Sequence, residues 1–187
     1  MSFKKAYQSN RMAVAASIPA YEHGLPRQCI AFVESIVALA EANTREGREV
    51  TPVAFIGSYT HDMPFAHVDL VGASSATHDQ VRMLAASQRA DYVLTVTEGW
   101  GLGDEHVVHV HQIISQYGSI SASPFRKPCA HFRLETRNAL WVANAWLSPV
   151  SATNNQHVLG PVEFRLADEA SPMVELYLQS SISKQVH

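Results

Sequence analysis

Cysteine is scarce in this sequence, which limits both its chemistry and its compartment. The 187 residues contain two cysteines, Cys29 and Cys129, and no Cys-x-x-Cys motif. Two such thiols do not make a disulfide framework. We therefore expect a reduced, cytoplasmic protein.

Blocks of positive charge and long apolar runs are also missing. The formal net charge is -3, and the densest basic sites are Lys4-Lys5 and Arg126-Lys127. Nucleic-acid binding needs clustered Lys and Arg, so we expect no nucleic-acid partner. The apolar run Met12–Ile18 has seven residues, far below the roughly 20 that cross a membrane, so we expect no membrane association.

Common catalytic and nucleotide-binding motifs are absent as well. Gly99, Gly101 and Gly103 do not fit Gly-x-Gly-x-x-Gly, and the chain has no Gly-x-Ser-x-Gly elbow. The sequence therefore gives no support for a dinucleotide site or a serine-hydrolase site, and predicts no cofactor.

The length and composition of the chain favour one globular domain. Hydrophobic residues make up 47% and charged residues 17%, which permits a real core and argues against disorder. We expect one domain over residues 1–187, within the usual size range. Residues 1–20 lack a pattern and are interpreted as a possible mobile arm, and residues 179–187 as a tail.

The clearest strand lies in the stretch from Asp91 to Trp100. Its side chains alternate, with Tyr92, Leu94 and Val96 on one face and apolar or β-branched residues on the other. A strand with so few polar side chains is expected in the interior of a sheet. We expect it to end at Glu98.

Three segments have helical patterns. Residues 28–44 repeat apolar side chains at helical spacing, and Gly47 is placed to end the helix. A capping-box pattern at Thr77–Gln80 predicts a helix running to Ala90. The stripe in Asp104–Tyr117 favours a third helix, although its Val-Val-His-Val-His sequence also fits a strand.

The remaining segments predict hairpins. Residues 50–57 and 67–72 are separated by a short loop, which favours an antiparallel pair. Residues 131–136 and 140–147 form one predicted hairpin, 162–166 and 174–178 another, with an exposed loop over 148–160. This order predicts an α+β domain: a largely antiparallel or mixed sheet of about seven strands, with two or three helices packed mainly on one face.

Glu98 is the carboxylate with the strongest catalytic signal. It lies at the predicted strand end beside Trp100, and a glutamate against an indole can act as a general acid or base. The more common alternative is a structural glutamate that pairs with an arginine or caps a turn.

Three histidines lie close together in the sequence. His106 and His109 share a face on a helix, whereas His109 and His111 share a face on a strand. Either pair could contribute to a divalent metal site, such as zinc. The alternative is a solvent-facing polar stripe.

Two other groups of polar residues have mainly structural interpretations. Of the two cysteines, Cys129, which lies beside Pro128 and His131, is the better candidate for a reactive thiol. The sequence nevertheless favours an unreactive thiol at this position. Arg133, Glu135 and Arg137 alternate on one strand face. We expect them to form a solvated or subunit-facing surface rather than an active site.

Two functions follow from these observations. The first is a non-catalytic binding or self-associating domain, favoured because no complete catalytic constellation is visible. The second is a small metal-assisted hydrolase that uses Glu98 with His106, His109 and His111. Open sheet edges and the lack of lysine between Lys127 and Lys184 favour a homodimer, with the contact near Leu140–Leu147.

Overall fold

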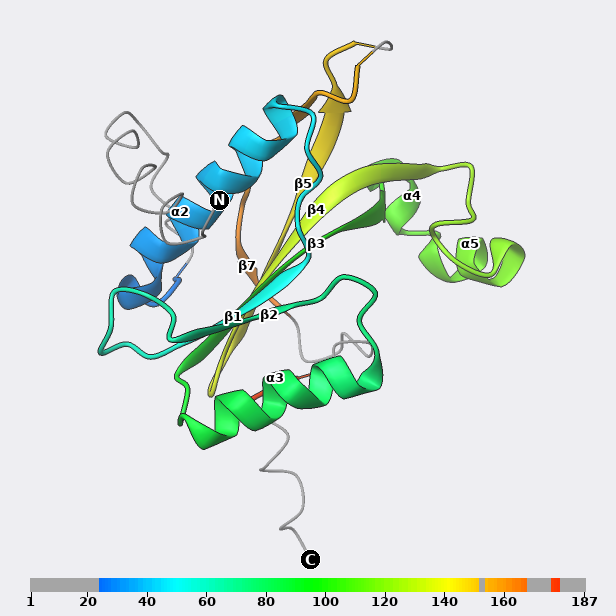
Figure 1. Ribbon diagram of the computed structural model, residues 1–187. Coiled ribbons are helices and arrows are strands. Elements are labelled where there is room, and N and C mark those ends of the chain that lie inside the picture. The colour runs from blue at the N-terminus through cyan, green and yellow to red at the C-terminus, as the bar shows by residue number, and fades with distance from the viewer. Residues whose placement is uncertain (1–23, 152–153, 168–175, 179–187) are drawn as a thin grey trace, which may run out of the picture.

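A curled antiparallel sheet forms the centre of the computed structural model, which describes residues 24–151, 154–167 and 176–178 (Figure 1). The predicted arm at 1–20 and the tail at 179–187 lie outside these residues. The α+β class is confirmed. No helix in the described ranges is long and apolar enough to cross a membrane.

Seven strands make up the sheet, in the order β2-β1-β3-β4-β5-β6, with β7 also paired to β5. Every described strand pair is antiparallel. β3 lies between β1 and β4, so its predicted interior position is confirmed. The strands are β1 (Val53–Gly57), β2 (Ala66–Asp69), β3 (Tyr92–Leu102), β4 (Arg126–Thr136), β5 (Leu140–Pro149), β6 (His157–Leu159) and β7 (Arg165–Leu166).

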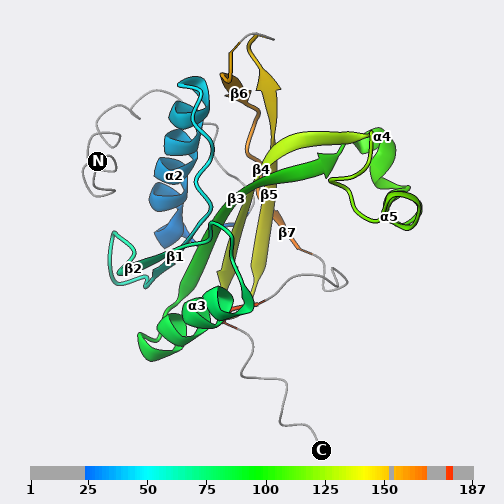
Figure 2. The ribbon, with the colours of Figure 1, turned by 45° about the vertical axis from the view of Figure 1, so that its right-hand side comes forward.

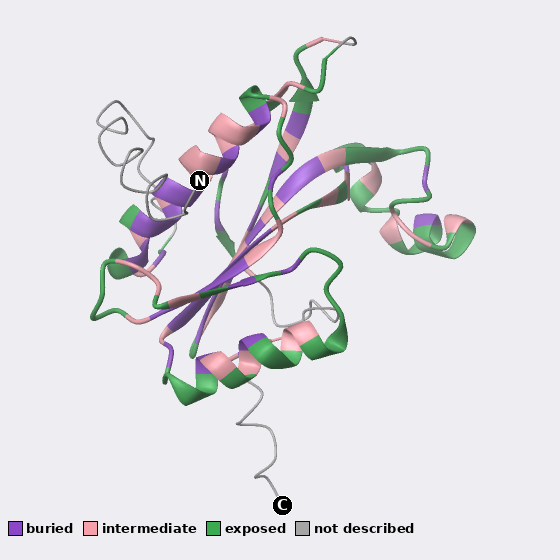
Figure 3. Ribbon diagram, viewed as in Figure 1, coloured by how far each residue is buried: buried purple, intermediate pink, exposed green. Residues whose placement is uncertain are grey.

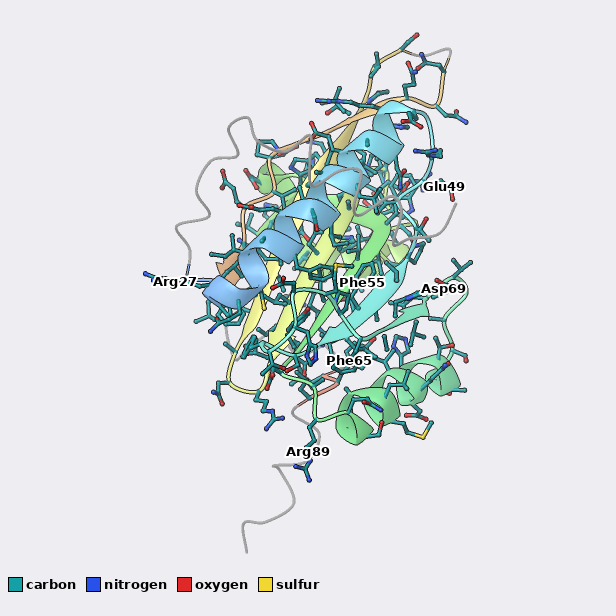
Figure 4. The ribbon with its side chains drawn as sticks, turned by 60° about the vertical axis from the view of Figure 1, so that its left-hand side comes forward. Arg27, Glu49, Phe55, Phe65, Asp69 and Arg89 are labelled. Atoms are coloured by element: carbon teal, nitrogen blue, oxygen red, sulfur yellow. The ribbon has the colours of Figure 1, made fainter. Side chains whose placement is uncertain are left out.

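The first long helix, α2 (Arg27–Arg45), covers one face of the sheet. It starts after Pro26 and is followed by Gly47, whose φ of +76° is a conformation that glycine adopts readily. Its apolar stripe packs on Tyr92 and on Phe55, whose ring lies edge-on to Phe32 at 5.4 Å. Figure 4 shows α2 on the side of Phe55, running from Arg27 at its start toward Glu49 beyond its end.

The second long helix, α3 (Ser75–Ser87), packs on the opposite face. Its Val81 and Ala85 belong to an apolar cluster with Ile56 and Val93, whereas Leu94 on the same strand belongs to the α2 cluster. The expected placement of helices mainly on one face therefore needs correction. Both faces of β1 and β3 are apolar, so each face needs its own cover.

α3 also begins earlier than the capping-box pattern at Thr77–Gln80 indicates. The residue before the helix is Ser74, whose backbone N–H donates to the Thr77 hydroxyl at 3.2 Å. Thr77 therefore lies inside the first turn and bonds back to the start of the helix.

β3 does not end at Glu98. It continues through Gly99 and Trp100 to Leu102, paired all along with β4. The glycines lower the strand propensity of this stretch, and pairing with a neighbouring strand compensates. The extended ribbon projects from the body and carries the short helices α4 (Asp104–Val107) and α5 (Val110–Tyr117) (Figure 2). The helical prediction for 104–117 is thus confirmed, in two pieces.

The segment after β5 differs most from its prediction. The β4–β5 hairpin is confirmed, but β6 lies within the expected loop at 148–160. Arg165–Leu166 pairs with β5, and residues 176–178, the described part of its predicted partner, are not a strand. β6 and β7 are short, and pairing with β5 determines their position.

Candidate functional site

A large hollow lies beside the projecting ribbon. This groove has a volume of about 900 Å³ and is enclosed by the end of the ribbon, α4, β5 and residues 161–166. Trp100, Trp146 and Phe164 contribute aromatic surface, and His131 and Asn144 contribute polar groups. A groove of this size with a few polar groups among aromatic side chains is typical of a binding site.

His131 is held in a fixed orientation on the wall of the groove. It lies opposite Asn144 in the β4–β5 register, and its Nδ1–H donates to Asn144 Oδ1 at 2.8 Å. Its Nε2 lies 3.3 Å from the sulfur of Cys129, two residues earlier on the same strand face. In the tautomer that carries its proton on Nδ1, the ring accepts from the thiol through Nε2.

The Cys129–His131–Asn144 chain has the residue types of a thiol nucleophile site, but its sulfur is not activated. Cys129 is fully buried. Burial, with a smaller contribution from the charge of Glu98, raises the pKa of its thiol to about 11. The thiol is therefore protonated at neutral pH, and its hydrogen bond orients His131 rather than generating a thiolate.

Two glycines of β3 make room for these side chains. A Cβ atom on Gly99 would lie 3.1 Å from His131 Nε2, and one on Gly101 would lie 2.9 Å from the Trp146 ring. Such contacts are tighter than ordinary van der Waals packing. The glycine run therefore lets the side chains of β4 and β5 lean across β3.

Glu98 lies outside the groove lining and is exposed. Its Oε2 accepts a hydrogen bond from the backbone N–H of Val50 at 3.0 Å. This bond joins the carboxylate to the connection between α2 and β1.

The three histidines are not among the residues that line the groove. His106 on α4 packs on Phe125, with ring centroids 4.3 Å apart, while His109 precedes α5 and His111 lies exposed on it. In the described ranges, no three His, Cys, Asp or Glu side chains are grouped so that they could hold a metal ion. His106, His109 and His111, which the sequence suggested as metal ligands, therefore do not form such a group.

Sequence reasoning did not identify the pair His131 and Asn144. The signal was present, because the predicted hairpin of residues 131–136 and 140–147 makes these two strands neighbours. The β4–β5 register places His131 opposite Asn144. The groove over this pair is also lined by the ribbon and by the segment after β6, which the hairpin pattern does not reveal.

Comparison with known proteins gives no further guide to the site. No protein-family model, no curated protein and no solved structure matches the chain. The function must therefore be argued from the groove and the surfaces around it.

Proposed function

We propose that this protein is a non-catalytic domain that binds a second copy of itself through the groove and the ribbon tip. The ribbon tip is the stretch from Gly99 to Pro128, with α4 and α5. The observation that carries the proposal is the apolar surface of this tip. Its exposed large hydrophobic side chains are Trp100, Val107, Val108, Ile114 and Phe125.

These side chains lie on a largely exposed part of the described chain. Figure 3 colours the crossing strands mainly as buried, whereas the tip is mainly exposed or intermediate. In α5, Ile113 is the one buried residue. Grouped apolar side chains on a projecting element are typical of interaction sites rather than of isolated surface residues.

A second copy fits this arrangement because the apolar tip and the groove belong to the same part of the molecule. Trp100 and Val107 line the groove and are also exposed, so the two surfaces are continuous. A two-fold axis can place the tip of each copy against the groove of the other, which buries the same patch twice. Closed two-fold dimers are the commonest oligomers.

The sequence predicted a dimer contact near Leu140–Leu147. This proposal restricts the contact to one residue of that strand. Trp141 is only 8% exposed and belongs to the core, whereas Trp146 lines the groove. β5 pairs with β4 along one edge, and with the short strands β6 and β7 along part of the other edge. Trp146, rather than the edge of β5, is therefore the candidate contact residue.

Binding is favoured over metal-assisted hydrolysis by the same geometry. Glu98 is engaged with Val50, the thiol of Cys129 is buried and protonated, and the three histidines point to no shared site. Both cysteines are free, so a reducing, cytoplasmic compartment stays part of the proposal.

Light scattering after size exclusion tests the proposal over micromolar to sub-millimolar concentrations. We expect a dimer for the wild-type chain and a monomer for the double variant Val107→Glu and Val108→Glu. Both positions are more than half exposed, so the fold should persist, while a buried unpaired charge costs an interface about 2–5 kcal/mol.

The matched control is Val71→Glu, an equally exposed valine outside the groove and the tip. It should remain a dimer. A wild-type monomer at the highest concentration would rule out self-association. A dimer that survives the double substitution would rule out this interface.

A further inference from the structure

Glu135 is a buried carboxylate on the face of the sheet that α3 covers. It is fully buried, although its place among alternating charged residues predicted a solvated surface. Its Oε2 accepts from the backbone N–H of Tyr177 at 2.9 Å, and its Oε1 from that of Leu178 at 2.6 Å. Arg133 Nη2 donates to Oε2 at 3.0 Å. The donors thus include two consecutive backbone amides from a segment more than 40 residues away.

The side chain of Tyr177 occupies a slot between α3 and the sheet. It is 5% exposed, and its hydroxyl lies 2.7 Å from Nδ1 of His78. The His78 ring stacks on it, with centroids 5.9 Å apart. The guanidinium carbons of Arg82 and Arg133 lie 6.0 and 5.3 Å from its ring centroid. The ring and the hydroxyl of the tyrosine are therefore both contacted.

The backbone before Tyr177 is contacted as well. Arg82 Nε donates to the carbonyl oxygen of Leu176 at 3.5 Å, the long end of hydrogen-bonding distance. Residues 176–178 do not pair with any described strand. The segment is held by side chains that bind its backbone and by the tyrosine slot, and not by extending the sheet.

We propose that His78, Arg82, Arg133 and Glu135 form a binding site for a short peptide with an aliphatic–Tyr–Leu sequence. We call these four residues the tyrosine site; Leu176–Leu178 is its ligand within the chain. The charge determines the class of ligand. A buried carboxylate needs N–H donors, and two consecutive backbone amides of a peptide supply them.

The ligand in the chain competes with the same sequence supplied from outside. The tyrosine site engages three consecutive residues through their own backbone and one ring, so no contact depends on the covalent link between segment and domain. A tethered ligand acts at an effective concentration of about millimolar. A free peptide should therefore bind weakly to the wild-type chain and more tightly once the internal tyrosine is removed.

The test uses the full-length chain and a fluorescein-labelled peptide of residues 173–181, followed by fluorescence polarisation. We expect the Tyr177→Ala chain to bind this peptide saturably, at least about tenfold more tightly than the wild-type chain. The peptide N-methylated at the position of Leu178 keeps every side chain but loses one N–H. It should lose at least about tenfold in affinity, as should a peptide with alanine for tyrosine.

Equal binding to the wild-type and Tyr177→Ala chains would overturn the proposal, and so would equal binding of the N-methylated peptide. If Tyr177→Ala does not fold, Leu178→Pro replaces it, because proline lacks the N–H that Glu135 accepts. Unfolding of both variants would show that the segment is part of the core and would also overturn the proposal. The tyrosine site shares no residue with the groove lining, so this result is independent of the proposed dimer.

Discussion

The carboxylate of Glu98 accepts a hydrogen bond from the backbone N–H of Val50 at 3.0 Å, across 48 residues of sequence. Val50 follows the end of α2 and is only 2% exposed. The bond ties the connection between α2 and β1 to β3, on the side of the sheet that α2 covers.

Removal of this acceptor should lower the free energy of unfolding. We expect Glu98→Ala to cost about 1–3 kcal/mol, because the amide of Val50 would be left without its acceptor. Glu98→Gln keeps a carbonyl oxygen in the same place and should cost clearly less. Urea denaturation measures both variants. Equal losses would show that charge, and not the hydrogen bond to Val50, is what matters at this position.

Truncation of the central strand should be much more costly. Leu94 is fully buried in the α2 cluster, so Leu94→Ala should lower the free energy of unfolding by about 2–5 kcal/mol. Met83→Ala on the exposed side of α3, where Met83 is 65% exposed, should change it by about 0.5 kcal/mol or less. A loss below about 1 kcal/mol at Leu94 would contradict its place in the core.

Both thiols should react slowly in the folded protein. Burial, assisted by the charge of Asp91, raises the pKa of the Cys29 thiol to about 12, and the pKa of Cys129 is raised to about 11. Disulfide reagents attack through the thiolate, which is scarce at pH 7–8. We expect little colour release from Ellman's reagent until denaturant is added.

The variant Cys129→Ser assigns any thiol that does react in the native state. A fast native reaction that disappears in this variant would mean that Cys129 is an activated thiol. The interpretation of the hydrogen-bonded chain Cys129–His131–Asn144 as structural would then be wrong.

Asp91 should make stability depend on pH. Its Oδ2 accepts from the Ser58 hydroxyl at 2.7 Å and from the Tyr59 backbone N–H at 3.0 Å. These bonds, with a smaller contribution from Arg137, lower the pKa of the Asp91 carboxyl below its ordinary value of 3.8. A depressed pKa means that the stabilisation is fully present above that ordinary value and is lost as the pH falls through the folded-state pKa.

The variant Asp91→Ala should therefore be less stable than wild type by about 1–3 kcal/mol at neutral pH. The difference should shrink as the pH falls below about 4, because the unfolded chain takes up a proton there, and it should be smallest below the lowered pKa of the folded carboxyl. Thermal or urea unfolding from neutral to acidic pH measures it. A difference that is constant over this range would show that the ionised form carries no special stabilisation.

The sequence by itself determined the elements whose apolar pattern is long and regular. Alternation along Tyr92–Val96 predicted an interior strand, and helical spacing over 28–44 predicted α2, because burial of one face requires that period. The β4–β5 hairpin followed from alternation on both sides of a turn. These patterns are local, so they can be recognised without knowledge of the partners.

Only the tertiary structure decided what the polar residues do. Glu135 alternates with arginines and so resembles a surface residue, yet it is buried because Tyr177 and Leu178 cover it. Glu98 resembles a site residue, yet it accepts from Val50. β6 lies in a segment predicted as a loop, and β7 covers the end of the predicted strand 162–166; both pair with β5. For Glu135 and Glu98 the partner lies more than 40 residues away in the sequence, and a local pattern holds no information about it.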